Sequence, residues 1–448
     1  MITLPEAFEQ EMKQLLGEEE YEAYRKTFDE AVHRGLRVNN GKISTEEFLR
    51  RTDIPLKKVP WIPNGFYYDE ESCNPAKDAD YYAGLYYLQE PSAMTPASRL
   101  PIEPDDRVLD LCAAPGGKST QSGLRMGGQG VLVCNEPVWE RAKILSQNIE
   151  RMGIPNALVV SAYPDQLAQR WPEAFDAIQV DAPCSGEGMF RRHPETRAEW
   201  SPESPAGCAK RQAEILDRAA KMLRPGGRMV YSTCTMNRTE NEDTVDAFLS
   251  RHADFSLEAF SLPGADAPDG MLTCYPHRMK GEGHFVALLR KHGDAPCNWQ
   301  KAPEKDAPSK DALQALHTFC PTASANVMRT GSGKPGRSRD ESVTLSCLPD
   351  RPVCDGIQVV RCGLQLGTVQ KKLFVPDHAW AMSIFPPDVP RVELTREDAR
   401  RYQAGETLPA DGKGWALACC DAIPLGWGKI SDGQMKNHYP KGLRRPLR

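Results

Sequence analysis

Two cysteines fifty residues apart carry the clearest indication of chemistry in this chain. Cys184 lies in Asp-Ala-Pro-Cys-Ser-Gly-Glu-Gly at 181–188, and Cys234 lies in Tyr-Ser-Thr-Cys-Thr at 231–235. Each segment follows an apolar run that is typical of a buried strand. A lone free cysteine usually behaves as a small buried hydrophobe. A pair of cysteine loops downstream of a glycine-rich turn instead indicates thiolate chemistry on a substrate held beside a nucleotide-like cofactor.

The glycine-rich turn lies within 108–120, where the pattern predicts a strand, a tight turn and the start of a helix. Glycines let a ligand approach the backbone, and the N–H groups of a helix N-terminus face that ligand. The segment is not a P-loop, because that motif requires a glycine five positions before Gly117 and the chain has Cys112 there. The motif G-x-G-x-x-G is also absent, so a doubly wound domain that binds a nucleoside is the remaining interpretation.

Acidic residues follow the later strands of the predicted sheet. Glu136 lies twenty residues beyond Gly116, where a carboxylate can accept both ribose hydroxyls or can simply cap a helix. Tyr163 and Asp165 lie in the next loop, which would either face an adenine or form an ordinary connection. Asp181 opens the first cysteine loop. Ligands bind beyond the carboxyl ends of parallel strands, so we expect these residues to converge on one crevice.

A thiolate suits the methylation of a pyrimidine, because carbon 5 of that ring is a poor nucleophile. Adding a thiolate to carbon 6 converts the ring to an enamine-like species that attacks an electrophilic methyl group. A carboxylate such as Asp181 could hold and polarise the base. A second cysteine is not needed for addition but could assist release. The base must be unpaired or flipped out to be reached. The spacing alone does not indicate which cysteine attacks.

Three motifs in order resemble the bacterial RNA cytosine-C5 methyltransferases of the Sun/Nop type, and most closely their ribosomal-RNA enzymes of the RsmF type. These three motifs are the segments 110–119, 181–190 and 231–235. The resemblance covers nearly the whole chain and includes the segments 36–39, 89–92 and 436–444. It implies an α/β fold, a Rossmann-like class I S-adenosylmethionine-dependent methyltransferase, with a small N-terminal domain and a β-rich PUA-like C-terminal domain that binds RNA.

The resemblance also implies the roles of individual residues. Cys234 would be the nucleophile, Cys184 the thiol that assists release, and Asp181 the third catalytic residue. S-adenosylmethionine would be bound by Cys112, Ala113, Ala114, Pro115, Gly116, Gly117, Lys118, Glu136, Tyr163, Asp165 and Asp181.

Two positions depart from the family pattern. Relatives can carry an acid eighteen residues before the Asp181 position, where this chain has Tyr163, and Asp165 is the nearby candidate to replace it. Gln179 interrupts a strand that is otherwise apolar, and the sequence offers no reason for it.

The hydrophobic patterns and local composition, together with the resemblance, predict four regions. They are an N-terminal RNA-binding, helical domain at 1–100, the catalytic domain at 101–291, a linker at 292–341 and the PUA-like domain at 342–448. An aromatic-rich stretch at 55–87 either stacks on bases or forms the core of a small domain. In the catalytic region, expected strands are 107–111, 130–135, 157–160, 177–180, 228–232 and 284–289, and expected helices are 139–152 and 208–223.

The composition excludes several classes of protein. Hydrophobic residues make up 40% and charged residues 26%, which is ordinary for a globular chain, and no run is long enough to span a membrane. No export signal opens the sequence, so we expect a cytoplasmic protein whose fourteen cysteines are reduced. No C-x-x-C pair occurs, so no metal site is expected.

Charge bears on the partner. The net charge is −5, but nucleic-acid binding needs only a local basic patch, and 436–448 contains five Lys and Arg residues and no acid. By itself this stretch is either a solvated tail or an RNA contact; the resemblance favours RNA contact.

The leading hypothesis is an enzyme that makes 5-methylcytosine in RNA, most readily 16S ribosomal RNA as part of the small ribosomal subunit. Transfer RNA as substrate, and a non-catalytic ribosome-assembly factor that keeps the fold, are the alternatives. No membrane and no obligate protein partner are expected.

Overall fold

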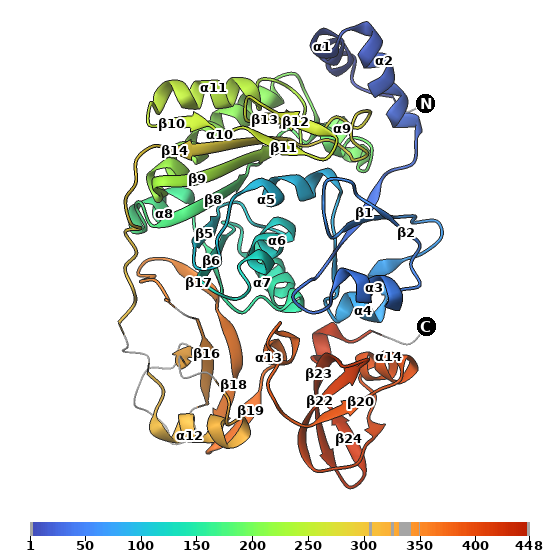
Figure 1. Cartoon of the computed structure of the whole chain (residues 1–448), viewed down its shortest axis with the longest axis vertical. Coiled ribbons are helices and arrows are strands. Elements are labelled where there is room, and N and C mark those ends of the chain that lie inside the picture. Colours follow the sequence, from blue (N-terminus) through green and yellow to red (C-terminus); the bar gives the residue numbers. More distant parts are fainter. Residues whose placement is uncertain (1–2, 304–306, 324–326, 331–341, 349, 446–448) are drawn as a thin grey trace.

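A nine-stranded mixed sheet forms the centre of the computed structural model, which describes residues 3–303, 307–323, 327–330, 342–348 and 350–445 (Figure 1). The strand order is β10-β14-β9-β8-β5-β6-β7-β17, and β13 also pairs with β14. Strands β5 to β9 are mutually parallel, while β14 and β17 join antiparallel. Their bounds are β5 (Arg107–Asp110), β6 (Val131–Asn135), β7 (Ala157–Ser161), β8 (Phe175–Asp181), β9 (Leu223–Thr233), β10 (Phe255–Leu257), β13 (Met271–Thr273), β14 (Phe285–Lys291) and β17 (Gln358–Cys362).

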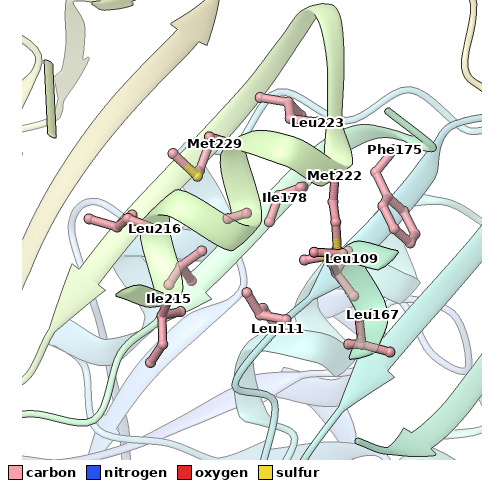
Figure 2. Packing of buried hydrophobic residues seen from close by; sticks show 14 of the residues in the cluster. Leu109, Leu111, Leu167, Phe175, Ile178, Ile215, Leu216, Met222, Leu223 and Met229 are labelled. Carbon is pink, nitrogen blue, oxygen red and sulfur yellow. The ribbon is translucent and has the colours of Figure 1, made fainter. Parts of the chain in front are cut away.

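Helices cover both faces of this sheet, because side chains of its parallel strands are apolar on both sides. On one face, Leu109 and Ile178 pack with Leu167, Ile215 and other side chains in one buried cluster (Figure 2). On the other face, Val108 packs with Leu145 in a second cluster. The helices are α5 (Thr95–Arg99), α6 (Gly117–Arg125), α7 (Trp139–Met152), α8 (Pro164–Arg170), α9 (Pro194–Glu199), α10 (Ser204–Met222) and α11 (Glu242–Arg251). This is the Rossmann-like α/β arrangement that the sequence predicts.

The N-terminal region has two parts. The hairpin of α1 (Glu6–Leu16) and α2 (Glu18–Lys26) shares a core with Phe190, Trp200 and Met236 of the catalytic region. A four-stranded sheet follows, in the order β2-β3-β1-β4. Its elements are β1 (Arg34–Val38), α3 (Thr45–Arg51), β2 (Leu56–Lys58), β3 (Gly65–Tyr68), α4 (Ala79–Tyr82) and β4 (Tyr86–Leu88).

The aromatic stretch at 55–87 contributes mainly to protein cores. Trp61, Tyr86 and Tyr87 are buried, whereas the Tyr81 and Tyr82 side chains are partly exposed. The sequence left open whether these aromatic rings stack on bases or form a core. For the three buried rings, the structure shows core formation.

Two further sheets form the C-terminal part, which lies below the catalytic sheet in Figure 1. One has the order β15-β16-β18-β19 and the other β20-β22-β23-β24-β21. The second shares a buried cluster with the N-terminal sheet, in which Leu36 and Phe48 meet Tyr402 and Met435. The bounds are β15 (Val327–Thr330), β16 (Val343–Cys347), β18 (Leu364–Gln370), β19 (Leu373–Pro376), α13 (His378–Met382), β20 (Arg391–Glu393), α14 (Arg396–Ala404), β21 (Leu408–Pro409), β22 (Gly414–Cys420), β23 (Ile423–Ser431) and β24 (Gln434–Asn437).

Several details differ from the sequence-based expectations. The predicted linker 292–341 contains helix α12 (Lys310–Phe319), whose Leu316 is fully buried. This part of the predicted linker is therefore packed against the rest of the protein. Residues 304–306, 324–326 and 331–341 lie outside the described chain. Helix α10 ends at Met222, and β9 already begins at Leu223, before the Pro-Gly-Gly segment. A shift in the β8–β9 register accommodates the extra residues. The remaining domain limits stay a prediction.

The basic segment 436–448 begins in β24 and continues through a short 3-10 helix at Lys441–Leu443. The Arg445 backbone N–H donates to the Gln403 carbonyl, and its guanidinium lies over the Tyr82 ring at 5.3 Å. The described part of this segment is therefore docked on the protein; residues 446–448 lie outside the described chain. Other short elements are β11 (Phe260–Leu262), β12 (Ala265–Ala267) and the 3-10 helices Thr27–Asp29, Pro75–Lys77, Ser92–Met94 and Glu187–Met189.

Arg37 on β1 attaches the N-terminal sheet to α6 of the catalytic region. Its buried guanidinium donates to the Gly117 carbonyl at 3.0 Å, to Thr120 Oγ1 at 2.9 Å and to Gln89 Oε1 at 3.1 Å. Each of these acceptors would lose a donor if the side chain were replaced by an apolar one.

We expect Arg37→Met to lower the free energy of unfolding by about 2–4 kcal/mol, because buried acceptors would be left unsatisfied. Urea denaturation measures this change. Arg34 lies on the same strand as Arg37 and forms an exposed ion pair with Glu70. Arg34→Met is therefore the matched control and should change the free energy of unfolding by about 1 kcal/mol or less. Equal effects of the two substitutions would contradict the role assigned to Arg37.

Candidate active site

A cavity of about 550 Å³ opens beyond the carboxyl ends of the parallel strands. Its lining includes eight residues predicted for the site: Cys112, Ala114, Glu136, Tyr163, Asp165, Asp181, Cys184 and Cys234. Of the other predicted residues, Ala113, Pro115 and Gly116 belong to the turn between β5 and α6, and Gly117 and Lys118 are the first residues of α6. The structure therefore brings the predicted set together at one edge of the sheet, as the topology requires.

The turn between β5 and α6 is shaped by close packing. Gly116 caps α6 with a φ of +112°, a conformation that favours glycine, and a Cβ there would lie 3.1 Å from Leu145 Cδ1. Asn135, at the end of β6, ties the neighbouring loops together: its Nδ2 donates to the Leu111 carbonyl, and its Oδ1 accepts from the Ala162 N–H. The first N–H groups of α6 have no partner within the helix and are available to a ligand.

Asp110 lies beneath this turn and explains Gln179. Gln179 Nε2 donates to Asp110 Oδ2 at 2.8 Å, and Ser119 Oγ donates to the same oxygen at 2.6 Å. Burial, with a smaller contribution from the Asp181 charge, raises the pKa of Asp110 to about 7. The polar residue in an apolar strand is therefore a hydrogen-bond partner for a buried carboxyl group.

Glu136 follows β6 and is almost fully buried. Its Oε1 accepts from the Val138 N–H at 2.9 Å, and its Oε2 lies 3.3 Å from Arg141 Nη1. The carboxylate therefore stabilises its own loop and also lines the cavity, so the two interpretations from the sequence are compatible.

Tyr163 and Asp165 follow β7, the neighbour of β6 in the sheet, and line the same cavity. Tyr163 is 69% exposed, and its backbone N–H donates to Gln166 Oε1 at the start of α8. Asp165 forms an ion pair with Arg218 of α10. Both residues are available to a ligand from the cavity side.

Asp181, at the end of β8, is the centre of a polar cluster. Lys118 Nζ donates to Oδ2 at 2.8 Å, Ser232 Oγ donates to Oδ1 at 2.8 Å, and His284 Nε2 lies 3.4 Å from Oδ1. Burial acts to raise the pKa of Asp181, but Lys118 and His284 hold it below its ordinary value, so the carboxylate is ionised.

His284 and Ser232 were missed by the sequence-based reasoning. Burial and the Lys118 ammonium lower the pKa of His284, so its imidazole is neutral at neutral pH. His284 is a polar residue at the start of the otherwise apolar expected strand 284–289. This position could have indicated that the site lies at that end of the strand. The Ser232 contact depends on the parallel register, in which Asp181 pairs with Ser232.

The two cysteine thiols meet because β8 and β9 are adjacent and parallel. The Sγ atoms of Cys184 and Cys234 are 3.0 Å apart, and the Cys234 backbone N–H donates to Cys184 Sγ at 3.3 Å. The hydrogen bond to Cys234, and then burial, raise the pKa of the Cys184 thiol. Cys184 therefore keeps its proton at neutral pH and can donate a hydrogen bond to its neighbour.

Metal ligation and membrane insertion find no support among the described residues. No group of three or more His, Cys, Asp or Glu side chains there has a geometry that could hold a metal ion. In the same part of the chain, no helix combines the length and apolarity needed to cross a membrane.

The Rossmann-like sheet, the glycine turn after β5 and the acid after β6 define a class I S-adenosylmethionine-dependent methyltransferase.

Comparison with known proteins identifies the family. Residues 97–290 match the model for 16S rRNA methyltransferase RsmB/F, and 4–91 match the N-terminal domain of 16S rRNA methyltransferase RsmF. Residues 325–384 match the RsmF rRNA methyltransferase first C-terminal domain, and 389–445 the methyltransferase RsmF PUA domain. Ribosomal RNA small subunit methyltransferase F of Klebsiella pneumoniae is 33% identical over 99% of this chain and 97% of its own length. The Serratia proteamaculans protein of that name is 34% identical over 92% of this chain and 91% of its own.

The chain belongs to the RsmF family of 16S rRNA methyltransferases, which confirms the resemblance inferred from its motifs. Among solved structures, a methyltransferase homolog protein from Pyrococcus horikoshii is 27% identical, with a TM-score of 0.57 over 64% of this chain and 95% of that one. NSun6 from the same organism, solved with SFG, is 23% identical, with a TM-score of 0.57 over 65% of this chain and 99% of that one, and supports the fold.

The raised pKa of Asp110 gives a pH-dependent prediction. The folded protein binds this proton more tightly than the unfolded chain, so the stability of the wild type should fall, relative to Asp110→Asn, as the pH rises from about 4 to about 7. Between about pH 5 and about pH 8 this relative loss should reach about 3 kcal/mol at most. Urea denaturation of both proteins at the two pH values measures it. Parallel pH dependences would show that the Asp110 carboxyl is not perturbed in this way.

Proposed function

We propose that this chain methylates carbon 5 of a cytosine in 16S ribosomal RNA, with Cys234 as the nucleophile and Cys184 assisting product release. The observation that carries the proposal is the 3.0 Å separation of the two thiols at the cavity that Asp181 also lines. The full-length relatives named ribosomal RNA small subunit methyltransferase F support 16S ribosomal RNA as the substrate.

S-adenosylmethionine supplies an electrophilic methyl group on a sulfonium. In this proposal Glu136 binds the ribose hydroxyls, because a buried carboxylate at the cavity wall can accept from both. Tyr163 and Asp165, which also line the cavity, would contact the adenine. The remaining contacts come from the turn between β5 and α6 and from the start of the first cysteine loop: Cys112, Ala113, Ala114, Pro115, Gly116, Gly117, Lys118 and Asp181.

Asp181 and Lys118 hold the target base. The ionised Asp181 carboxylate accepts hydrogen bonds, and its free lone pairs can take an N–H of the base and polarise the ring. The Lys118 ammonium balances the carboxylate charge at 2.8 Å and is itself a hydrogen-bond donor at the site. Addition at carbon 6 builds negative charge on the ring, and donation from the Lys118 ammonium to a ring acceptor would favour it.

The thiols perform the covalent steps. The Cys234 thiolate adds to carbon 6, and the electron pair of the 5,6 double bond forms the new bond from carbon 5 to the methyl carbon. The bond from that carbon to the sulfonium breaks at the same time, and the sulfur would leave as a neutral thioether. Loss of the carbon-5 proton to a base then restores the double bond and expels Cys234 as a thiolate. Because Cys184 keeps its proton, it can donate a hydrogen bond to the departing sulfur and stabilise it as a leaving group.

The N-terminal and PUA modules are proposed to bind the RNA. They share the buried cluster that contains Leu36 and Tyr402, so they can present one continuous surface. The docked basic segment adds Lys436, Lys441 and Arg444 to it. The RNA could be engaged within the small ribosomal subunit, and the enzyme would then act in the cytoplasm.

The two cysteines should give opposite phenotypes when each is replaced. Cys234→Ala should abolish methyl transfer while S-adenosylmethionine binding survives, because only the nucleophile is lost. Cys184→Ala should leave enzyme trapped on RNA as a denaturation-resistant adduct, because the leaving group is no longer stabilised. Labelled methyl transfer and denaturing gels measure the two effects. Normal turnover by Cys234→Ala, or absence of the adduct in Cys184→Ala, would contradict the assigned roles.

The substrate is tested with labelled S-adenosylmethionine and total RNA. We expect the label in 16S ribosomal RNA, and bisulfite sequencing of RNA from a deletion strain should lose one or more 5-methylcytosine sites there. Labelling of transfer RNA alone would replace the substrate assignment. No labelling of any RNA fraction, in naked form or in small subunits, would favour a non-catalytic assembly factor.

A further inference from the structure

Each cysteine loop carries a buried glutamate that binds the backbone of the other loop. Glu187, three residues after Cys184, accepts from the N–H groups of Met236 and Asn237 at 3.1 and 3.2 Å. Glu240, six residues after Cys234, accepts from the Ser185 N–H at 3.0 Å. Glu187 is 1% exposed and Glu240 is fully buried. The arrangement is reciprocal, because each loop is held by a carboxylate from its partner.

Further hydrogen bonds join the same two loops. Asn237 Nδ2 lies 2.9 Å from an oxygen of each glutamate and donates to both. The Gly188 N–H donates to the Cys234 carbonyl at 2.9 Å, and a Cβ at Gly188 would lie 2.9 Å from that same oxygen. Gln212 of α10 adds a donor to Glu240 at 2.7 Å. The backbone on either side of both thiols is therefore fixed.

The burial of Glu187 and Glu240 between the two loops lowers the stability of the fold unless their contacts compensate for the lost hydration. Burying an ionisable group is unfavourable unless hydrogen bonds compensate for it. Here the donors to both glutamates are neutral N–H groups of the backbone and of amide side chains, so no cation balances either carboxylate through these contacts. The strand pairing fixes the chain as far as Asp181 on β8 and Thr233 on β9, and both thiols lie beyond those residues.

We propose that Glu187 and Glu240 are positioning residues that hold the two thiols at reacting distance, and this inference rests on the proposed function. Glu187 binds the loop of Cys234 and so controls its attack on carbon 6. Glu240 binds the residue next to Cys184 and so controls release. The two residues therefore affect different steps of one reaction.

Substituting each glutamate by glutamine separates these steps. A glutamine keeps the size of the side chain but turns an NH2 group toward backbone N–H donors, which opposes the native contact. In single-turnover reactions Glu240→Gln should transfer the methyl group but accumulate the covalent adduct about tenfold over wild type. Glu187→Gln should slow methyl transfer by about tenfold or more without accumulating the adduct. A purely structural role would reduce both steps together.

A measurement without RNA tests the geometry directly. The oxidant diamide takes two electrons and two protons from a pair of thiols and forms a disulfide, and peptide mapping identifies the Cys184–Cys234 link. We expect this link to form about tenfold more slowly in both glutamine variants than in wild type, because the sulfurs are no longer held together. Leu289→Ala, a core substitution on β14 away from both loops, is the control and should leave the rate unchanged.

The outcomes are distinguishable. Wild-type rates of cross-linking in folded Glu187→Gln and Glu240→Gln would overturn the positioning role, whatever the methylation assay shows. Slower cross-linking in both variants, with no methylation by the wild type, would support the positioning geometry and contradict the proposed function. If a glutamine variant does not fold, the aspartate variant at that position replaces it. It keeps the charge but shortens the reach, so the same effects in smaller size are expected.

Discussion

The adjacency of β8 and β9 is the constraint on which the rest of the site depends. Because these strands are parallel and pair Asp181 with Ser232, the loops that follow them leave the sheet side by side. The thiols of Cys184 and Cys234 then lie 3.0 Å apart although fifty residues separate them in the chain. The same register delivers Ser232 Oγ to the Asp181 carboxylate. A shift of one residue would point these side chains to the opposite face of the sheet.

The N-terminal and C-terminal regions contact the catalytic region through buried side chains, hydrogen bonds and strand pairing as well as through the chain itself. The α1–α2 hairpin packs on Met236, two residues from Cys234. Arg37 of the N-terminal sheet donates to the first turn of α6, which follows the glycine turn. The last C-terminal sheet shares a core with the N-terminal sheet, and β17 extends the catalytic sheet beside β7. The modules expected to contact RNA are therefore packed against the catalytic region or against each other.

Local patterns in the sequence were sufficient for the central elements. Apolar runs bounded by turns predicted the strands β5 to β8 and β14 within a few residues, and the helical pattern predicted α7 at 139–152. The convergence of Cys184, Cys234 and Asp181 followed from the rule that ligands bind at strand ends. Features that depend on distant partners were not predictable: the contact of His284 with Asp181, the packing of α12, and the strand that 358–362 adds to the catalytic sheet. Gln179 was puzzling in the sequence because its partner, Asp110, is 69 residues away.

The site is proposed to work through two thiols with different roles, in which Cys234 attacks the base and Cys184 assists release. An RNA that carries 5-fluorocytosine at the target position distinguishes these roles. Fluorine at carbon 5 of the target cytosine cannot leave as a cation, so the enzyme should remain covalently attached after methyl transfer. Peptide mapping of the trapped complex then identifies the attached residue. If Cys234 is the nucleophile, the RNA is joined to Cys234 and Cys184 stays free. Attachment through Cys184 would contradict it.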